Sequence, residues 1–158
     1  MNNRGKRRIF AVAACMLALV FLIQLPVEAK ENVSCSKLYD AVKEKCKDGD
    51  GKVTKKSKCN FLTYTYRKNV EDFYYATDSD QVYCVCIVRA DSTSDAKDIK
   101  KQFDSTKKEK KNDRYLKKDE KKVVKGARTG RSGSYVWYIC LGSSSANKKA
   151  EKTLKKAL

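Results

Sequence analysis

The sequence predicts an α+β fold: a single small domain with an antiparallel sheet of about four strands in two hairpins and helices packed on one face. Short apolar runs bounded by turn residues alternate with stripes of apolar residues at helical spacing. These segments follow one another as helix, strand or loop, hairpin, helix, hairpin, helix. The single proline, Pro26, precedes them all, so no proline-rich linker divides the series.

Residues 1–29 are predicted to be a signal peptide. Basic residues at 4 and 6–8 precede an apolar run over 9–25, and Pro26 ends that run. Val27 and Ala29 are the small side chains that a signal peptidase reads, which places cleavage after Ala29. An uncleaved N-terminal membrane anchor is the alternative, because the run approaches the ~17–25 residues that span a bilayer. We therefore expect an exported protein, secreted or associated with the cell envelope.

The rest of the chain is expected to form one domain with one core. Residues 30–71 supply an N-terminal helix and a polar connection, and residues 72–158 supply the α+β core of the same domain. The predicted helix spans 35–46, with Ser34 or Ser36 as its cap, and the polar connection spans 47–57. Residues 61–66 have the composition of a strand.

A hairpin is predicted next, with arms at 73–76 and 82–89 and a turn at 78–80. The second arm is apolar at nearly every position, so it is expected to be a central strand covered on at least one face. A helix then starts at 91–94, a segment rich in capping side chains. Ala96, Ile99 and Phe103 form its buried stripe, and beyond residue 105 the helix either frays or continues as a solvated rod.

The last third of the chain predicts a second hairpin and a closing helix. The hairpin arms are 122–128 and 135–141, joined by a glycine- and serine-containing loop. The closing helix opens at Gly142 and the serines after it. Its apolar residues recur at a spacing of four: Ala146, Ala150, Leu154 and Leu158.

Several of these segments together resemble a known family. The features are Tyr74-Tyr75 before the central strand, the capped helix at 91–103, Tyr115-Leu116 with Glu120, the run 133–136 in the last strand, and the closing helix with Leu154. Over about residues 36–158 the chain resembles the domain-of-unknown-function 4358 family of small exported bacterial domains. The resemblance implies a bacterial envelope or secreted protein, often lipid-anchored, although this chain lacks a lipobox. It implies no activity.

The charge of the chain favours an anionic partner. Lys and Arg number 36 against 19 Asp and Glu, a formal net charge of +17. Such an excess favours contact with an anionic envelope polymer or a membrane surface. Nucleic acid is not expected, because the chain is predicted to be exported and basic runs such as 107–111 lack interleaved aromatic residues. A protein partner and a lysine-rich surface that serves solubility alone are the alternatives.

The stretch Asp48-Gly49-Asp50-Gly51 resembles the middle of a calcium loop. A twelve-residue calcium loop needs oxygen ligands at both ends, including a bidentate carboxylate at position 12. In the register set by Asp48 and Asp50, position 1 is Cys46 and position 12 is Ser57. Four nearby lysines oppose a cation, so a tight turn is preferred to a weak calcium-binding module.

Six cysteines follow the predicted leader, and their pairing is open among fifteen combinations. Cys84 and Cys86 alternate on one strand face and are expected to pack as small apolar side chains beside Cys140. A bridge from Cys59 to Cys35 or Cys46 is the pairing to examine first. Core or structural cysteines are the preferred interpretation; a thiol-based redox protein that uses Cys84 or Cys86 is the alternative.

Enzymatic constellations are sparse. The chain contains no histidine, which excludes Ser-His and Cys-His nucleophile pairs and histidine-bearing metal sites. No catalytic residue, metal ligand or cofactor-binding residue is assigned, and a non-enzymatic protein is expected. Aromatic side chains on the predicted strands could form a glycan-stacking platform, although half-buried strand residues are equally consistent with them. These are Tyr64, Tyr66, Tyr74, Tyr75, Trp137 and Tyr138.

Overall fold

The computed structural model describes residues 32–46, 49 and 51–158 of the chain. The predicted signal peptide at 1–29 therefore lies outside the described residues. Within the described part, no helix combines the length and the apolar character that crossing a membrane requires.

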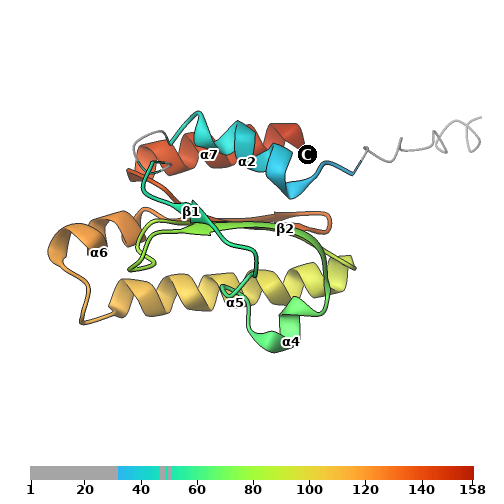
Figure 1. Cartoon of the computed structure of the whole chain (residues 1–158), viewed down its shortest axis with the longest axis horizontal. Coiled ribbons are helices and arrows are strands. Elements are labelled where there is room, and N and C mark those ends of the chain that lie inside the picture. Colours follow the sequence, from blue (N-terminus) through green and yellow to red (C-terminus); the bar gives the residue numbers. More distant parts are fainter. Residues whose placement is uncertain (1–31, 47–48, 50) are drawn as a thin grey trace, which may run out of the picture. The chain divides into compact units, whose positions relative to one another are not determined.

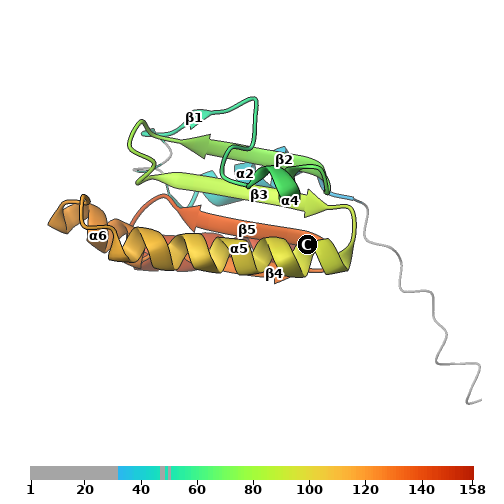
Figure 2. The same cartoon turned by 90° about the horizontal axis from the view of Figure 1, so that it is seen from below.

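A five-stranded antiparallel sheet organises residues 32–158, with strand order β1-β2-β3-β5-β4. Strands β2 (Val70–Thr77) and β3 (Cys84–Ala90) form the first predicted hairpin, and β4 (Arg128–Ser132) and β5 (Tyr135–Cys140) form the second. β3 pairs with β5 at the centre, where Cys84 lies opposite Cys140. The short β1 (Thr54–Lys55) borders β2, and β4 forms the other edge (Figure 2). The α+β prediction is confirmed.

Helices cover both faces of the sheet, not one as predicted (Figure 1). Helices α5 (Thr93–Asn112) and α6 (Lys118–Lys125) and the segment 59–62 enclose one core, which we call the α5 face. Helices α2 (Cys35–Lys43) and α7 (Ser144–Ala157) enclose the other, the α7 face. The one-face prediction was wrong because β3 and β5 are apolar at successive positions, so each face presents side chains that need cover.

Serine caps fix where the long helices begin. Ser34, Ser92 and Ser143 each accept a hydrogen bond from a backbone N–H in the first turn of α2, α5 and α7. α5 does not fray after residue 105, and its charged C-terminal half continues as a helix to Asn112. This half is the solvated rod that the sequence allowed.

Two segments differ from the strands that their composition suggested. Residues 61–66 lie in a turn and in the short helix α4 (Tyr64–Arg67), and Tyr64 is 82% exposed. Residues 122–125 are the end of α6, so the second hairpin begins only at Arg128. In both places β-branched or aromatic residues suggested a strand. One residue of each segment, Phe61 and Val124, is instead buried in the core of the α5 face.

Candidate anion-binding site

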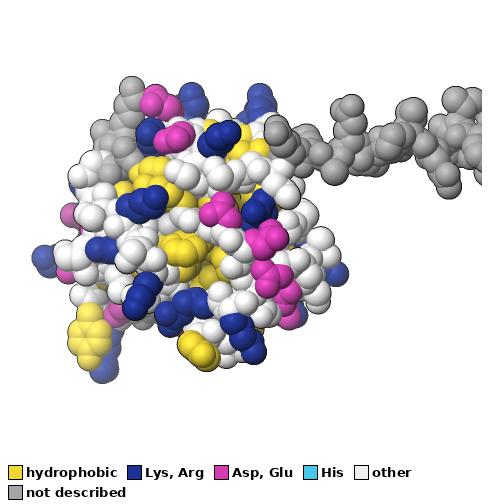
Figure 3. Space-filling model, turned by 45° about the vertical axis from the view of Figure 1, so that its right-hand side comes forward, with side chains coloured by type: hydrophobic (Ala, Val, Ile, Leu, Met, Phe, Trp, Pro, Cys, Tyr) yellow, Lys and Arg dark blue, Asp and Glu magenta, His cyan; other side chains and the backbone are white. Residues whose placement is uncertain are grey.

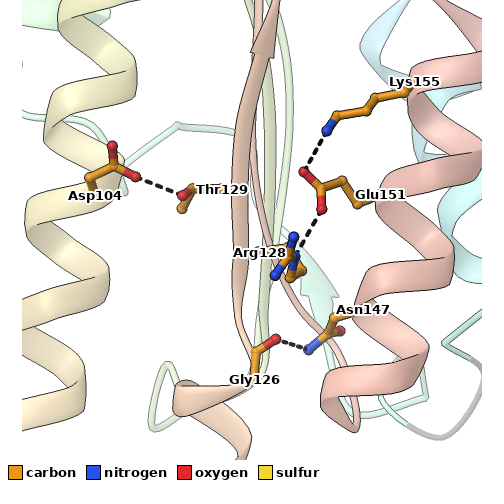
Figure 4. Close-up of polar contacts among 7 residues, drawn as sticks. All are labelled: Asp104, Gly126, Arg128, Thr129, Asn147, Glu151 and Lys155. Carbon is orange, nitrogen blue, oxygen red and sulfur yellow. Dashed lines mark hydrogen bonds and ion pairs between the residues drawn. The ribbon is translucent and has the colours of Figure 1, made fainter.

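The edge strand β4 lies between the two helical layers (Figure 4). On the α5 side, Thr129 Oγ1 donates a hydrogen bond to Asp104 at 2.7 Å. On the α7 side, Arg128 reaches Glu151. Gly130 faces Trp137 across the hairpin, and a Cβ at Gly130 would come within 2.3 Å of the indole ring. Glycine therefore lets the edge strand lie directly against the buried tryptophan.

Glu151 is the most buried carboxylate at this edge, with 5% of its surface exposed. Arg128 Nε donates to one carboxylate oxygen at 2.8 Å, and Lys155 Nζ lies 3.0 Å from the other. Although burial opposes ionisation, hydrogen bonds from Arg128 and Lys155 hold the pKa of Glu151 below its ordinary value. The ionised Glu151 therefore fixes two cationic side chains that are themselves about half-exposed.

A groove of about 250 Å³ opens over this carboxylate, and we call it the basic groove. Its lining residues are Arg128, Lys148, Glu151, Lys152 and Lys155. Four cations against one carboxylate leave a local charge of +3. Arg128 and Lys155 keep further N–H groups to offer after each has contacted Glu151. The groove thus presents donors and positive charge to an incoming anion.

Asn147 anchors the end of α7 below the groove. Its side-chain oxygen accepts from the Leu141 N–H at 3.0 Å. Its amide nitrogen donates to the carbonyls of Gly126 and Gly142, at 3.1 and 3.0 Å. Since Asn147 is fully buried, it ties the loops before β4 and after β5 to the first turn of α7. This bonding holds the α7 lysines at a fixed distance from Arg128.

The positive field continues from the groove toward α5. The pKa of Lys107 is lowered, first by its partial burial and then by repulsion from Arg128. Three other lysines of α5 and α6 have acidic partners one turn away: Lys100 with Asp104, Lys101 with Asp98, and Lys122 with Asp119. Figure 3 likewise shows acidic side chains among the Lys and Arg of the visible face. Where α7 meets β4, four cations line the basic groove against one carboxylate.

The cysteines are buried, and none is disulfide-bonded among the described residues. Cys84, Cys86 and Cys140 pack on the α5 face as predicted, and Cys59 joins them. Cys35 and Cys46 lie on the α7 face, so the predicted bridge from Cys59 to either of them is wrong: the sheet separates them. Burial raises the pKa of Cys84 and Cys86 well above that of a free thiol.

The aromatic side chains that could have formed a glycan-stacking platform do not share one exposed face. Tyr74 and Trp137 are buried on the α7 face, whereas Tyr75 and Tyr138 are buried on the α5 face. Tyr66 is half-buried and Tyr64 points into solvent from α4. Successive side chains of a strand point to opposite faces of the sheet, so Tyr74 and Tyr75, like Trp137 and Tyr138, cannot belong to one surface.

Asp48 and Asp50, the residues of the calcium-binding alternative, lie outside the described residues. Gly49 between them is described and buried, and a Cβ there would come within 1.3 Å of the Leu141 carbonyl oxygen. A side chain at position 49 would therefore clash with the backbone of Leu141, which explains this glycine of the motif without a calcium ion. Within the ranges that the structure describes, no three or more acidic or cysteine side chains are grouped to hold a metal ion.

A comparison with protein families gives one match. The model described as Domain of unknown function (DUF4358) matches residues 55–141. The chain belongs to this family. No curated protein and no solved structure matches it.

The DUF4358 match covers most of the sheet and the α5 face. It includes Arg128 and the four cysteines of the α5 face, and it ends at Leu141 before α7 begins. The lysines of the basic groove lie on α7 and are therefore outside the matched segment.

Sequence reasoning did not single out Arg128 or Glu151. The available signal was on α7, where one acidic residue stands among five lysines. That residue falls four positions after Asn147 and next to Ala150, on the buried side of the helix. A carboxylate on a buried stripe indicates an ion pair with a neighbouring element, although the sequence does not name the partner.

Proposed function

We propose that this chain is an exported, non-enzymatic binding domain that contacts an anionic envelope polymer or membrane surface through the basic groove. The observation that carries the proposal is the carboxylate of Glu151, which holds Arg128 and Lys155 side by side, while Lys148 and Lys152 add two further cations to the groove. A flexible lysine must lose side-chain entropy to meet an anion, whereas these two cations are already positioned.

Two properties of the chain support this function over solubility alone, beyond a net charge of +17 that suits either role. The helices α5 and α6 offset part of their charge with acidic neighbours, whereas α7 has one acidic residue, and it is buried. Export, predicted from residues 1–29, would bring the domain to the cell surface, where phosphate-bearing polymers and lipid headgroups are the abundant anions.

The test compares two double variants of the full chain. Lys148→Gln with Lys152→Gln removes two groove cations, and Lys118→Gln with Lys125→Gln removes two exposed cations from α6. Sedimentation with vesicles of phosphatidylcholine, with and without phosphatidylglycerol, measures lipid binding, and retention on immobilised polyphosphate measures polymer binding. At about 1 kcal/mol per lysine near an anionic surface, the groove variant should lose roughly 10- to 30-fold in affinity.

The α6 variant should lose much less, and added salt should weaken binding by the unmodified chain in both assays. Binding to vesicles alone would assign a membrane surface, and binding to polyphosphate alone would assign a polymer. Equal losses in the two variants would show that general charge, and not the groove, recognises the anion. Salt-insensitive binding, or equal binding to uncharged vesicles, would contradict the proposed function.

A further inference from the structure

Cys59 and Cys86 are in direct contact inside the α5 face. Their sulfur atoms are 3.4 Å apart, although the residues are 27 positions apart in the chain. Cys59 is 4% exposed and lies between β1 and α4, whereas Cys86 is fully buried in the middle of β3. To reach the ~2.05 Å of a disulfide bond, the two sulfur atoms need approach by only roughly 1.4 Å.

Hydrogen bonds within the segment that carries Cys59, and one from α5, fix the position of this segment. Gln102 of α5 donates its side-chain N–H to the carbonyl of Phe61 at 2.9 Å. Arg67 donates to the side-chain oxygen of Asn60 at 3.2 Å, and the Leu62 N–H donates to the Cys59 carbonyl at the same distance. The loop and α5 therefore hold Cys59 in place beside Cys86. The ring of Phe61, two residues after Cys59, packs against Phe103 and Tyr138.

The two thiols have different surroundings. A hydrogen bond from Cys86, then N–H groups of Leu62 and Phe61 and the charge of Arg67, lower the pKa of Cys59 against the effect of its burial. Burial, and then the bond to Cys59, raise the pKa of Cys86. A cavity of about 110 Å³, lined by residues that include Cys59, Arg67 and Phe73, lies beside the first thiol. Cys59 is therefore the member of the pair that an external reagent meets first.

We propose that Cys59 and Cys86 are a dithiol site that forms an intramolecular disulfide by exchange with a low-molecular-weight disulfide. The Cys59 thiolate attacks one sulfur of the external disulfide, its proton having passed to solvent, and the second sulfur leaves as a thiolate. Cys86 then loses its proton, attacks Cys59 of the mixed disulfide and releases the remaining external thiolate. Two protein thiols are oxidised, one external disulfide is reduced to two thiols, and the protons released balance those that the two leaving thiolates take up.

Cys84 and Cys140 provide the internal comparison. They lie opposite each other on β3 and β5 within the same core. The Cys140 thiol donates to the carbonyl of Val82 at 3.2 Å, and burial raises the pKa of Cys140 to about 12. Burial likewise raises the pKa of Cys84. Since no hydrogen bond or positive charge outweighs burial at either thiol, this pair is expected to stay reduced under the conditions that oxidise Cys59 and Cys86.

The test treats the reduced full chain, which has seven cysteines, with oxidised glutathione, then denatures it at acidic pH and alkylates the remaining thiols in denaturant. We expect the intact mass to show five alkylated cysteines and no bound glutathione. Cleavage after Lys and Arg should yield peptide 59–67 linked to peptide 69–89, which contains both Cys84 and Cys86. A Cys84→Ala variant should keep that link, which assigns it to Cys86.

A Cys86→Ala variant should instead retain one glutathione, on peptide 59–67, because the second thiol that displaces it is missing. Near-ultraviolet circular dichroism that matches the unmodified chain would show that this variant is folded. Seven alkylated cysteines in the treated wild type, a link between Cys84 and Cys140 in place of the expected one, or glutathione retained on the wild type would each overturn the proposal.

Discussion

The two faces of one sheet are built by different means. The α5 face is filled by four cysteines and a group of aromatic rings in which Phe61 contacts Tyr75, Phe103 and Tyr138. The α7 face contains Trp137, aliphatic residues, the stacked rings of Tyr39 and Tyr74 and two cysteines. Polar groups also hold its helices: Asn147 anchors α7, and the Asp72 carboxylate accepts the Cys35 N–H at the start of α2 at 2.7 Å. Aromatic packing dominates the α5 face, where Gln102 donates to the Phe61 carbonyl of the loop, whereas a fully buried asparagine with three backbone partners fixes α7 on the other face.

This difference explains why the two candidate sites lie where they do. Hydrogen bonds specify the position of a helix more narrowly than apolar contacts do, so α7 can present cations at set distances from β4. Aromatic and thiol side chains exclude water instead, and they bring two sulfur atoms together across distant parts of the chain. Substitutions that remove packing from one face or hydrogen bonds from the other should therefore separate the two contributions.

The largest effect is expected at Phe103. Its ring is fully buried and lies edge-on to Phe61, with centroids 5.2 Å apart, and to Tyr138. Phe103→Ala should lower the free energy of unfolding by about 3–5 kcal/mol, because it removes buried area and leaves a cavity. Urea denaturation followed by tryptophan fluorescence measures this. Phe103→Leu, which keeps most of the volume, should cost less than half as much; a loss under 1 kcal/mol for alanine would contradict the view that aromatic packing holds this face.

A somewhat smaller effect is expected at Asn147 on the other face. Asn147→Ala leaves the Leu141 N–H and the Gly126 and Gly142 carbonyls without their partner. Because unsatisfied buried groups are costly, the variant should lose about 2–4 kcal/mol in the same denaturation assay. Asn112→Ala at the exposed end of α5 is the matched control and should change stability by less than ~0.5 kcal/mol. Equal effects of the two substitutions would mean that the anchor contributes nothing beyond helix propensity.

The elements that the sequence predicted well are those with a long, unambiguous pattern. The first hairpin, α5, β5 and α7 combine a periodic apolar stripe with serine caps or turn residues, and local chemistry settles such segments. The segment 61–66 has no such agreement: its alternating aromatic and threonine residues suit a strand, yet Phe61 is drawn under the sheet and α4 turns outward. Tertiary packing decided that segment, and no local signal could reveal it.

The sites were less predictable than the fold because each joins distant elements. Arg128 and Glu151 meet between β4 and α7, and Cys59 meets Cys86 between a loop and β3. The one-face arrangement of helices expected from the sequence also hid which cysteines share a core. Strand alternation correctly grouped Cys84 with Cys86, and the pairing of β3 with β5 places Cys140 beside them as expected, but the sequence did not bring Cys59 to the same core.

The smallest effect, and the most informative for the α7 face, is expected from Glu151→Gln. Since the pKa of Glu151 in the folded chain lies below its unfolded value of about 4.3, its charge stabilises the fold above that pH, and this contribution is lost as pH falls through the lower, folded pKa. The variant should be roughly 1 kcal/mol less stable than the wild type at pH 7, a modest value because Arg128 and Lys155 are about half-exposed. Denaturation at a series of pH values should show this gap closing in acid, whereas Asp119→Asn, at an exposed pair with Lys122, should show almost no gap at any pH. A gap that stays constant down to strongly acidic pH would mean that Glu151 acts through its packing and not through the charge that positions the two groove cations.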